Sequence, residues 1–231
     1  MKYESAVENS ANRAPAEAET ALAPPDKSSL NTAKRILDLM VAIPALFFLS
    51  PLMLVVGLLV RLQDGGPVFF VQDRRGFGGV DFACMKFRTM RTDAQDVLGN
   101  LLATDPEMAA EWRATQKLRK DPRITKIGVF LRKTSLDELP QLLNIIRGEM
   151  SVVGPRPIVE DEVRRYGENI ASYDAVRPGV TGLWQISGRN DTTYEERVQM
   201  DVDYAEKVSV FSDIVILFKT IPAILFSRGA Y

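Results

Sequence analysis

An uncharged stretch from Leu39 to Val60 constrains the fold of this chain more than any other feature. Asp38 precedes the stretch and Arg61 follows it. As a straight helix it would be about 33 Å long, enough to cross a bilayer core of roughly 30 Å. Its length therefore predicts a membrane helix, with a straight span and a buried core helix as the alternatives.

Two prolines argue against a straight crossing. Ser50-Pro51 lies in the middle of the stretch, and Pro44 precedes it. A proline inside a helix removes a backbone hydrogen bond and clashes with the preceding turn. Such a break is tolerated at membrane depth where a neighbouring Ser, or another part of the protein, satisfies the freed carbonyl groups. The sequence therefore predicts a helix break at Ser50 and Pro51.

The flanks of the stretch argue for a hairpin. The positive-inside rule depends on a difference in basic residues between the two ends. Here both ends are basic, with Lys27, Lys34 and Arg35 before the stretch and Arg61, Arg74 and Arg75 after it. We therefore predict a re-entrant membrane helix over residues 39–60 that enters and leaves on the cytoplasmic side.

The composition excludes several kinds of chemistry. The net charge of −1 gives no indication of a nucleic-acid partner. The chain has no histidine, which excludes His-based metal sites, a Ser-His-Asp triad and a His general base. Its single cysteine, Cys84, excludes an internal disulfide. Acid–base or nucleophilic chemistry must come from carboxylates, Lys, Tyr or Cys84, and a bound metal would be a hard ion such as Mg²⁺.

The remaining patterns predict a helix-rich α/β fold with a short β-hairpin. Residues 1–31, rich in Ala, Glu, Pro and Ser, are expected to form a disordered tail. Strands are expected at Val68–Val71 and Phe82–Phe87, joined by a glycine turn. Helices are expected at 93–103, 106–117 and 193–207, with N-caps at Asp93, Asp105 and Thr193. The apolar stretch 208–226 suits a helix lying in the membrane interface, or a core helix.

An adjacent acid pair, Asp137 and Glu138, lies near the start of another predicted helix. Ser135 and Glu138 have the spacing of a capping box, which would explain Glu138 without any function. That interpretation accounts neither for Asp137 nor for Pro140 inside the helix. Local exceptions of this kind are expected where function overrides stability. We therefore take Asp137 and Glu138 as the candidate catalytic residues.

Two later segments carry candidate phosphate ligands. Gly154-Pro155-Arg156-Pro157 is a rigid backbone that presents one guanidinium, which suits bidentate phosphate binding, although a simple tight turn is the alternative. The segment 177–190 is punctuated by glycine and contains Trp184, Gln185 and Arg189. It is expected either to hold a nucleotide by stacking and hydrogen bonding or to be an ordered loop.

Basic residues gather in two further stretches, and both have an open interpretation. One comprises Arg74, Arg75, Lys86, Arg88 and Arg91, and the other runs from Arg113 to Lys133. Either stretch can dock on anionic lipid head groups, and the second can also receive phosphates. A solvated surface explains both equally well.

Taken together, the motifs resemble those of the bacterial sugar transferases, the monotopic phosphoglycosyl transferases that begin polysaccharide assembly on a polyprenyl phosphate. The resemblance covers Ala33 to about Phe226. It rests on KRILD with Ser50-Pro51, on MKFRTM, on LRKTSLDELPQLLNIIRGEMSVVGPRP, and on RPGVTGLWQISGRN with MDVDYA. The chain resembles the minimal catalytic form of the family with an added tail, and residues 32–231 would form the transferase domain.

The resemblance implies a monotopic α/β membrane protein with a re-entrant helix, a cytoplasmic catalytic part over residues 61–231, and Mg²⁺. Asp137 matches the nucleophile, and Glu138 matches the partner that helps to bind the metal. Arg132 and Arg156 match phosphate-contacting arginines, and Arg189 is a further candidate substrate ligand. Asp201 matches another site carboxylate and a second metal ligand. Ser50 and Pro51 match the helix break.

The implied reaction transfers a hexose-1-phosphate, of galactose or glucose, from a UDP-sugar to undecaprenyl phosphate at the bacterial inner membrane. UMP would leave as Asp137 takes up the phosphosugar, in the first membrane step of exopolysaccharide, capsule or O-antigen synthesis. Expected partners are membrane lipid, a second copy of the chain and polysaccharide assembly enzymes. The alternatives are a metal-dependent hydrolase of nucleotide-sugars or lipid diphosphates, and a membrane-anchored scaffold.

Overall fold

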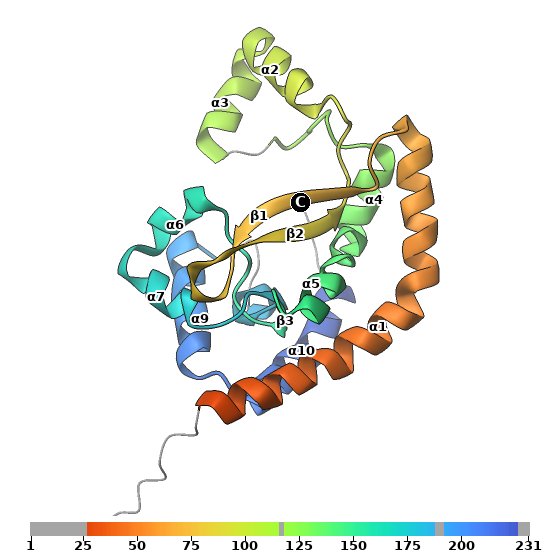
Figure 1. Ribbon diagram of the computed structural model, residues 1–231. Helices are drawn as coiled ribbons and strands as arrows, with labels where there is room; N and C mark the ends of the chain where they lie inside the picture. The colour runs from red at the N-terminus through yellow and green to blue at the C-terminus, as the bar shows by residue number, and fades with distance from the viewer. Residues whose placement is uncertain (1–26, 116–117, 188–191, 226–231) are drawn as a thin grey trace, which may run out of the picture.

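The computed structural model describes residues 27–115, 118–187 and 192–225. Figure 1 shows a helix-rich α/β protein in which short strands lie between helices. The elements are α1 (Lys27–Asp64), β1 (Phe69–Arg75), β2 (Asp81–Phe87), α2 (Ala94–Thr104), α3 (Pro106–Thr115), α4 (Lys126–Thr134), α5 (Gln141–Arg147), β3 (Ser151–Val153), α6 (Glu160–Tyr166), α7 (Ile170–Asp174), β4 (Gly179–Thr181), α8 (Leu183–Ser187), α9 (Tyr194–Glu206) and α10 (Val210–Leu225). The predicted fold class is confirmed to this extent.

The predicted tail and one predicted ligand fall largely outside this description. Residues 1–26 and Arg189 lie outside the described residues. Residues 27–31, which were expected to belong to the tail, form the first turn of α1.

Helix α1 contains the whole apolar stretch and bends near its middle, so that the rest of the protein lies on the inner side of the bend (Figure 1). Both Pro44 and Pro51 lie inside this one helix. Pro51 has no N–H to donate to the carbonyl of Phe47, four residues earlier. The Ser50 hydroxyl donates to that carbonyl instead, at 2.8 Å. The helix therefore continues through Ser50-Pro51 as a bend.

The exposure of α1 decides one alternative. Within the described chain, α1 is the one helix long and apolar enough to cross a membrane, and only 11% of its most apolar window is buried. Its exposed side chains include Met40, Phe47, Phe48, Leu54 and Leu62. A core helix would be mostly buried, so the core-helix alternative for 39–60 is wrong.

Both halves of α1 nevertheless pack on the rest of the protein. Ala42 in the first half joins a core cluster with Ile145 of α5. Val56 and Val60 in the second half join another cluster with Leu131 of α4. These contacts place α4 and α5, with the acid pair between them, against the inner side of α1.

A buried ion pair joins α1 to α10. The Lys34 ammonium donates to Asp213 at 2.5 Å, to the Tyr204 hydroxyl at 2.9 Å and to the Val153 carbonyl at 2.8 Å. Lys34 and Asp213 are both buried. We call these four residues the α1–α10 junction. Because Val153 directly precedes Gly154, the junction supports the backbone that presents Arg156.

The predicted hairpin is confirmed, with longer strands than expected. Strands β1 and β2 are antiparallel, and Phe69 pairs with Phe87 at one end of the ladder. The turn between them is a 3₁₀ turn, Phe77–Gly79. Gly78 and Gly79 have φ angles of 69° and 73°, which side-chain-bearing residues rarely adopt, so the glycines serve the turn.

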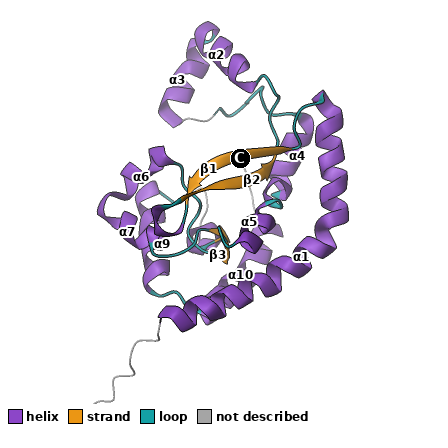
Figure 2. Ribbon diagram, viewed as in Figure 1, coloured by secondary structure: helices purple, strands orange, loops and turns teal. Residues whose placement is uncertain are grey.

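Helices α2 and α3 form an arm that lies apart from the other elements (Figure 2). The predicted N-cap of α3 is confirmed, since the Asp105 carboxylate accepts hydrogen bonds from the Glu107 and Met108 N–H groups at 3.0 and 3.1 Å. The predicted cap of α2 is wrong. The Asp93 side chain makes no cap hydrogen bond and pairs with Arg91 instead.

The helix predicted to begin at Ser135 is split in two. Ser135 ends α4 in the left-handed conformation, and its side chain makes no cap hydrogen bond to the next turn. A 3₁₀ turn, Leu136–Glu138, follows, and α5 begins only after Pro140. The capping-box interpretation of Glu138 is therefore wrong, because the backbone changes direction at Ser135.

The segment 177–190 was expected to be a loop, but its described part contains β4 and α8. Strand β4 runs parallel to β3, with Ser151 opposite Gly179. A Cβ atom on Gly179 would lie 2.1 Å from the Gly154 nitrogen. The glycines of both segments thus permit a close strand contact that brings Arg156 and Gln185 to one place.

Helices α9 and α10 agree with expectation at their ends. The capping box of α9 is confirmed, with the Thr193 N–H donating to Glu196 at 2.8 Å and the Glu196 N–H donating to the Thr193 hydroxyl at 3.2 Å. Helix α10 is amphipathic, because Phe211 and Phe218 are exposed while Ile216 is buried.

Candidate active site

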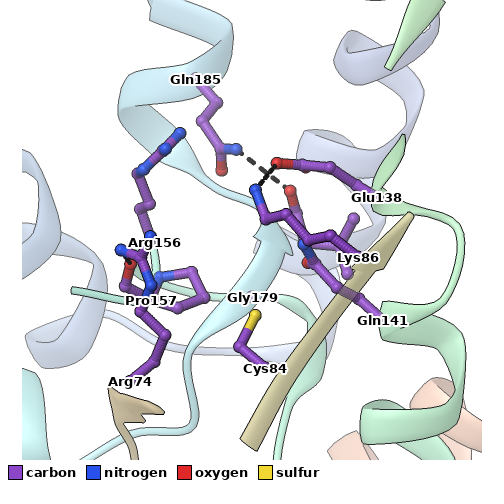
Figure 3. A pocket seen from close by; sticks show the side chains of 10 residues that line it. Arg74, Cys84, Lys86, Glu138, Gln141, Arg156, Pro157, Gly179 and Gln185 are labelled. Carbon is purple, nitrogen blue, oxygen red and sulfur yellow. Dashed lines mark hydrogen bonds and ion pairs between the residues drawn. The ribbon is translucent and has the colours of Figure 1, made fainter. Parts of the chain in front are cut away.

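One open pocket of about 280 Å³ lies between strand β2, the 3₁₀ turn Leu136–Glu138 and the β3–β4 region (Figure 3). Its lining residues are mostly polar: Arg74, Cys84, Lys86, Glu138, Gln141, Arg156, Pro157, Gly179, Val180 and Gln185. Three cationic side chains line it, so the pocket suits an anionic part of a ligand, such as a phosphate group.

The centre of the pocket is an ion pair. The Lys86 ammonium donates to Oε1 of Glu138 at 2.6 Å (Figure 3). Burial alone would raise the pKa of Glu138. The positive charges of Lys86, Arg156 and Arg74, with the Lys86 hydrogen bond, outweigh burial and lower that pKa below its ordinary value. Glu138 is therefore held ionised.

Asp137 precedes Glu138 on the same 3₁₀ turn and is not among the residues that line the pocket. Burial and the neighbouring charge of Glu138 raise the pKa of Asp137, while Lys86 and Arg132 act in the opposite direction. In the described part of the chain, no other side chain donates a hydrogen bond to its carboxylate. An aspartate carboxylate can act as the nucleophile of a covalent mechanism.

Two of the predicted arginines lie near this turn. Arg132 lies in the last turn of α4, and its Nε donates to the Thr89 hydroxyl at 2.9 Å. Burial lowers the pKa of Arg132. The negative charge of Asp137 acts in the opposite direction but does not outweigh burial. Arg156 lines the pocket and is exposed, with its guanidinium 5.9 Å from the Trp184 ring centre. Both arginines can therefore meet a phosphate near Asp137.

Asp201 is placed differently from its prediction. It is buried on α9 and does not line the pocket. Its Oδ2 accepts a hydrogen bond from the Tyr166 hydroxyl at 2.7 Å, while its Oδ1 has no partner among the described residues. Burial raises the pKa of Asp201 to about 7, although Tyr166 and the charge of Arg156 lower it. Asp201 thus influences the site through Arg156.

Comparison with known proteins identifies the family of this chain. The bacterial sugar transferase family matches residues 29–227. The chain belongs to this family.

Three relatives show the range of similarity. The exopolysaccharide production protein ExoY of Rhizobium meliloti (strain 1021) is 55% identical over 86% of this chain and 88% of its own length. The undecaprenyl-phosphate galactose phosphotransferase of Salmonella typhimurium is 49% identical over 89% of this chain and 43% of its own length. The UDP-glucose:undecaprenyl-phosphate glucose-1-phosphate transferase of Caulobacter vibrioides is 36% identical over 90% of this chain and 75% of its own length. This chain is therefore a sugar transferase.

The sequence analysis missed two roles in the transferase pocket. Lys86 was grouped with residues of a basic surface, and Gln141 was not singled out, yet both line the pocket. One signal for Lys86 was its place in MKFRTM, two residues after Cys84, which puts both side chains on one face of a strand. Nothing in the sequence showed which residue that face would meet.

The burial of Trp184 disfavours nucleotide stacking, which was one of the two interpretations of the segment 177–190. Trp184 is buried, and the guanidinium groups of Arg197 and Arg156 lie 4.7 and 5.9 Å from its ring centre. Its ring therefore supports two arginines and does not present a free face to a base.

The donor groups of the pocket fit a magnesium ion in part. No cluster of three or more metal-ligating side chains occurs in 27–115, 118–187 and 192–225. Mg²⁺, however, is commonly bound through one or two carboxylates together with substrate phosphates and water. The Glu138 carboxylate uses one oxygen for Lys86 and faces the pocket. Such a set matches an ion that arrives with a phosphorylated substrate.

Proposed function

We propose that this sugar transferase moves a hexose-1-phosphate from a UDP-sugar to undecaprenyl phosphate and releases UMP. The names of two relatives, a galactose phosphotransferase and a glucose-1-phosphate transferase that act on undecaprenyl phosphate, support the hexose and the lipid acceptor. The observation that carries the mechanism is the Asp137 carboxylate. Among the described residues, no other side chain donates a hydrogen bond to it, and the positive charges of Lys86 and Arg132 act on it.

The reaction has two displacements. An Asp137 carboxylate oxygen attacks the phosphorus that bears the sugar, and the phosphorus–oxygen bond to UMP breaks. The acyl phosphate on Asp137 is then attacked by an oxygen of undecaprenyl phosphate. This second step forms undecaprenyl diphosphate-sugar and returns the Asp137 carboxylate. A covalent intermediate suits two substrates that arrive from different phases.

The surrounding residues position the phosphate and neutralise its charge. Phosphoryl transfer depends mainly on these two effects. Arg156 is exposed in the pocket, and the charges of Arg132 and Asp137 act on each other, so we place the transferred group near these two arginines. When bound, Mg²⁺ would add further charge neutralisation, with Glu138 as the residue that holds it. Asp201 stays a prediction as a second ligand. One of its carboxylate oxygens, Oδ2, accepts a hydrogen bond from the Tyr166 hydroxyl.

The membrane arrangement follows from α1 and α10. We place the bend of α1 in one leaflet of the inner membrane, as a re-entrant helix with both ends on the cytoplasmic side. The exposed apolar side chains of α1, such as Phe47 and Phe48, support this placement. Helix α10 would lie in the interface with Phe211 and Phe218 toward lipid. The reaction would then begin exopolysaccharide, capsule or O-antigen synthesis; a homodimer and assembly-enzyme partners stay predictions.

The test is a covalent adduct formed from the donor alone. The solubilised enzyme is mixed with UDP-glucose or UDP-galactose, without lipid acceptor, and its intact mass is measured. One of the two donors should increase the mass of the enzyme by one hexose phosphate, and peptide mapping should place this adduct on Asp137. Asp137→Asn should abolish the adduct and lower turnover by at least about 10³-fold, as expected for loss of a nucleophile.

The matched control is Asp96→Asn, which changes an exposed acid on α2 and should leave the adduct unchanged. An adduct that persists in Asp137→Asn would contradict the nucleophile assignment. Steady release of free hexose phosphate without acceptor would instead indicate the hydrolase.

A further inference from the structure

The three cations that line the pocket are held in different ways. Arg74 is committed, because it donates to the Pro157 carbonyl at 2.9 Å and to Gln72 at 2.7 Å. Arg156 is exposed, and its guanidinium makes no hydrogen bond within the described residues. Among the residues that the structure describes, Lys86 is held by Glu138 alone. A diphosphate that enters the pocket therefore meets one cation that is ready and one that is occupied.

The geometry of Lys86 permits a change of partner. Its side chain leaves β2 on the same face as Cys84, which also lines the pocket. The Lys86 and Glu138 side chains are 23% and 27% exposed, so the pair borders the open space. An ammonium carries three donors on a flexible stem, and this one uses a single donor. It can turn within the pocket while the strand stays in place.

We propose that Lys86 exchanges partners when the donor binds, leaving Glu138 and donating to a phosphate oxygen of the nucleotide diphosphate. This inference rests on the proposed function and adds a donor-binding residue to it. The exchange is favourable because the ammonium then contacts an anionic phosphate oxygen, while the charges of Arg156 and Arg74 continue to stabilise the Glu138 carboxylate. It also releases the Glu138 carboxylate into the pocket, beside the phosphate.

Binding of UDP to the full-length, detergent-solubilised enzyme tests the proposal. Calorimetry is done with EDTA present, so that divalent cations do not contribute. Lys86→Met should weaken UDP binding by about 10- to 100-fold, the usual effect of losing a hydrogen bond to a charged group. Lys86→Arg should retain most of the affinity. The matched control is Lys126→Met, an exposed lysine on α4, which should bind UDP as the wild type does.

A double variant separates exchange from simple neutralisation. If Lys86 only offsets the charge of Glu138, then Lys86→Met/Glu138→Gln should recover wild-type affinity for UDP. If Lys86 contacts the phosphate, the double variant should stay at least about 10-fold weaker than Glu138→Gln alone. A double variant that binds UDP as tightly as Glu138→Gln alone would overturn the proposal.

Two further outcomes distinguish this inference from the proposed function. If the wild type binds UDP and Lys86→Met binds it equally well, the inference is wrong and the proposed function stands. If the wild type binds neither UDP nor either UDP-hexose, both are wrong.

Discussion

Two lysine–carboxylate pairs in this protein have almost the same length and different surroundings. Lys34 and Asp213 lie 2.5 Å apart in the α1–α10 junction, and Lys86 and Glu138 lie 2.6 Å apart in the pocket. The side chains of the first pair are 9% and 1% exposed, and those of the second are 23% and 27% exposed. The comparison shows how one chemical pair can serve two purposes.

The pairs also differ in how fully their polar atoms are used. The Lys34 ammonium has three acceptors, and Asp213 receives Lys34 on one oxygen and the Tyr204 hydroxyl on the other, at 2.8 Å. Lys86 and Glu138 have one hydrogen bond between them. A buried and fully paired charge holds its neighbours in place, because any separation leaves it unsatisfied. A half-exposed pair with spare donors can separate at small cost.

The carboxylates of the two pairs respond to their surroundings in opposite directions. Burial raises the pKa of Asp213 in spite of Lys34. The pKa of Glu138 is lowered, because several pocket cations together outweigh its burial. The junction thus holds its charge at a cost in desolvation, whereas the pocket has an excess of positive charge that suits an anionic substrate.

The largest effect should come from breaking the junction. Lys34→Met leaves Asp213 buried without its cation, and removing one partner of a buried pair typically costs about 3–5 kcal/mol. The free energy of unfolding, measured by urea titration of the solubilised protein, should fall by that amount.

The double variant Lys34→Met/Asp213→Leu is the control for this prediction. Replacing both members with apolar groups removes the uncompensated charge, so much of the stability should return. A double variant no more stable than Lys34→Met would show that shape, and not charge, governs the junction.

A smaller effect is expected from Asp201, a buried carboxylate that has a tyrosine partner and no lysine. Its pKa is about 7 in the folded protein and ordinarily 3.8. The folded state therefore binds the proton more tightly, and this contribution to stability, complete below pH 4, is lost as the pH rises through 7. Asp201→Asn should reduce the loss of stability between pH 5 and pH 8 by on the order of 2 kcal/mol. Urea titrations at both pH values measure it; an unchanged pH dependence would contradict the assignment.

The smallest effect should come from the pocket pair. Lys86→Met should change the free energy of unfolding by less than about 1 kcal/mol, as for partly exposed ion pairs. The same urea titration measures it, with Lys126→Met for reference. A loss as large as that of Lys34→Met would remove the distinction between the two pairs.

The elements that were predicted well depend on local signals. The hairpin, the arm α2–α3 and the capping box at Thr193 depend on turn glycines, N-cap residues and proline positions within a few residues of one another. The acid pair was also found locally, from adjacency and its conflict with Pro140. Its ordinary explanation as a capping box failed, because the left-handed Ser135 ended α4 first.

What was missed depends on distant segments. Strand β4 is only three residues long and exists because β3 lies beside it. The partner of Glu138 is Lys86, 52 residues earlier in the chain. The sequence left stacking open for the segment that contains Trp184, and only packing shows that Arg156 and Arg197 lie against its ring.

The amino-acid order by itself determined the apolar helix, its proline positions, the acid pair and the exclusion of histidine chemistry, because each depends on residue type and short spacing. Only the tertiary structure decided that Lys34 is enclosed while Lys86 faces a pocket. Both lysines lie near a carboxylate, but burial, and the number of acceptors around each ammonium, arise from segments that meet only when the chain folds.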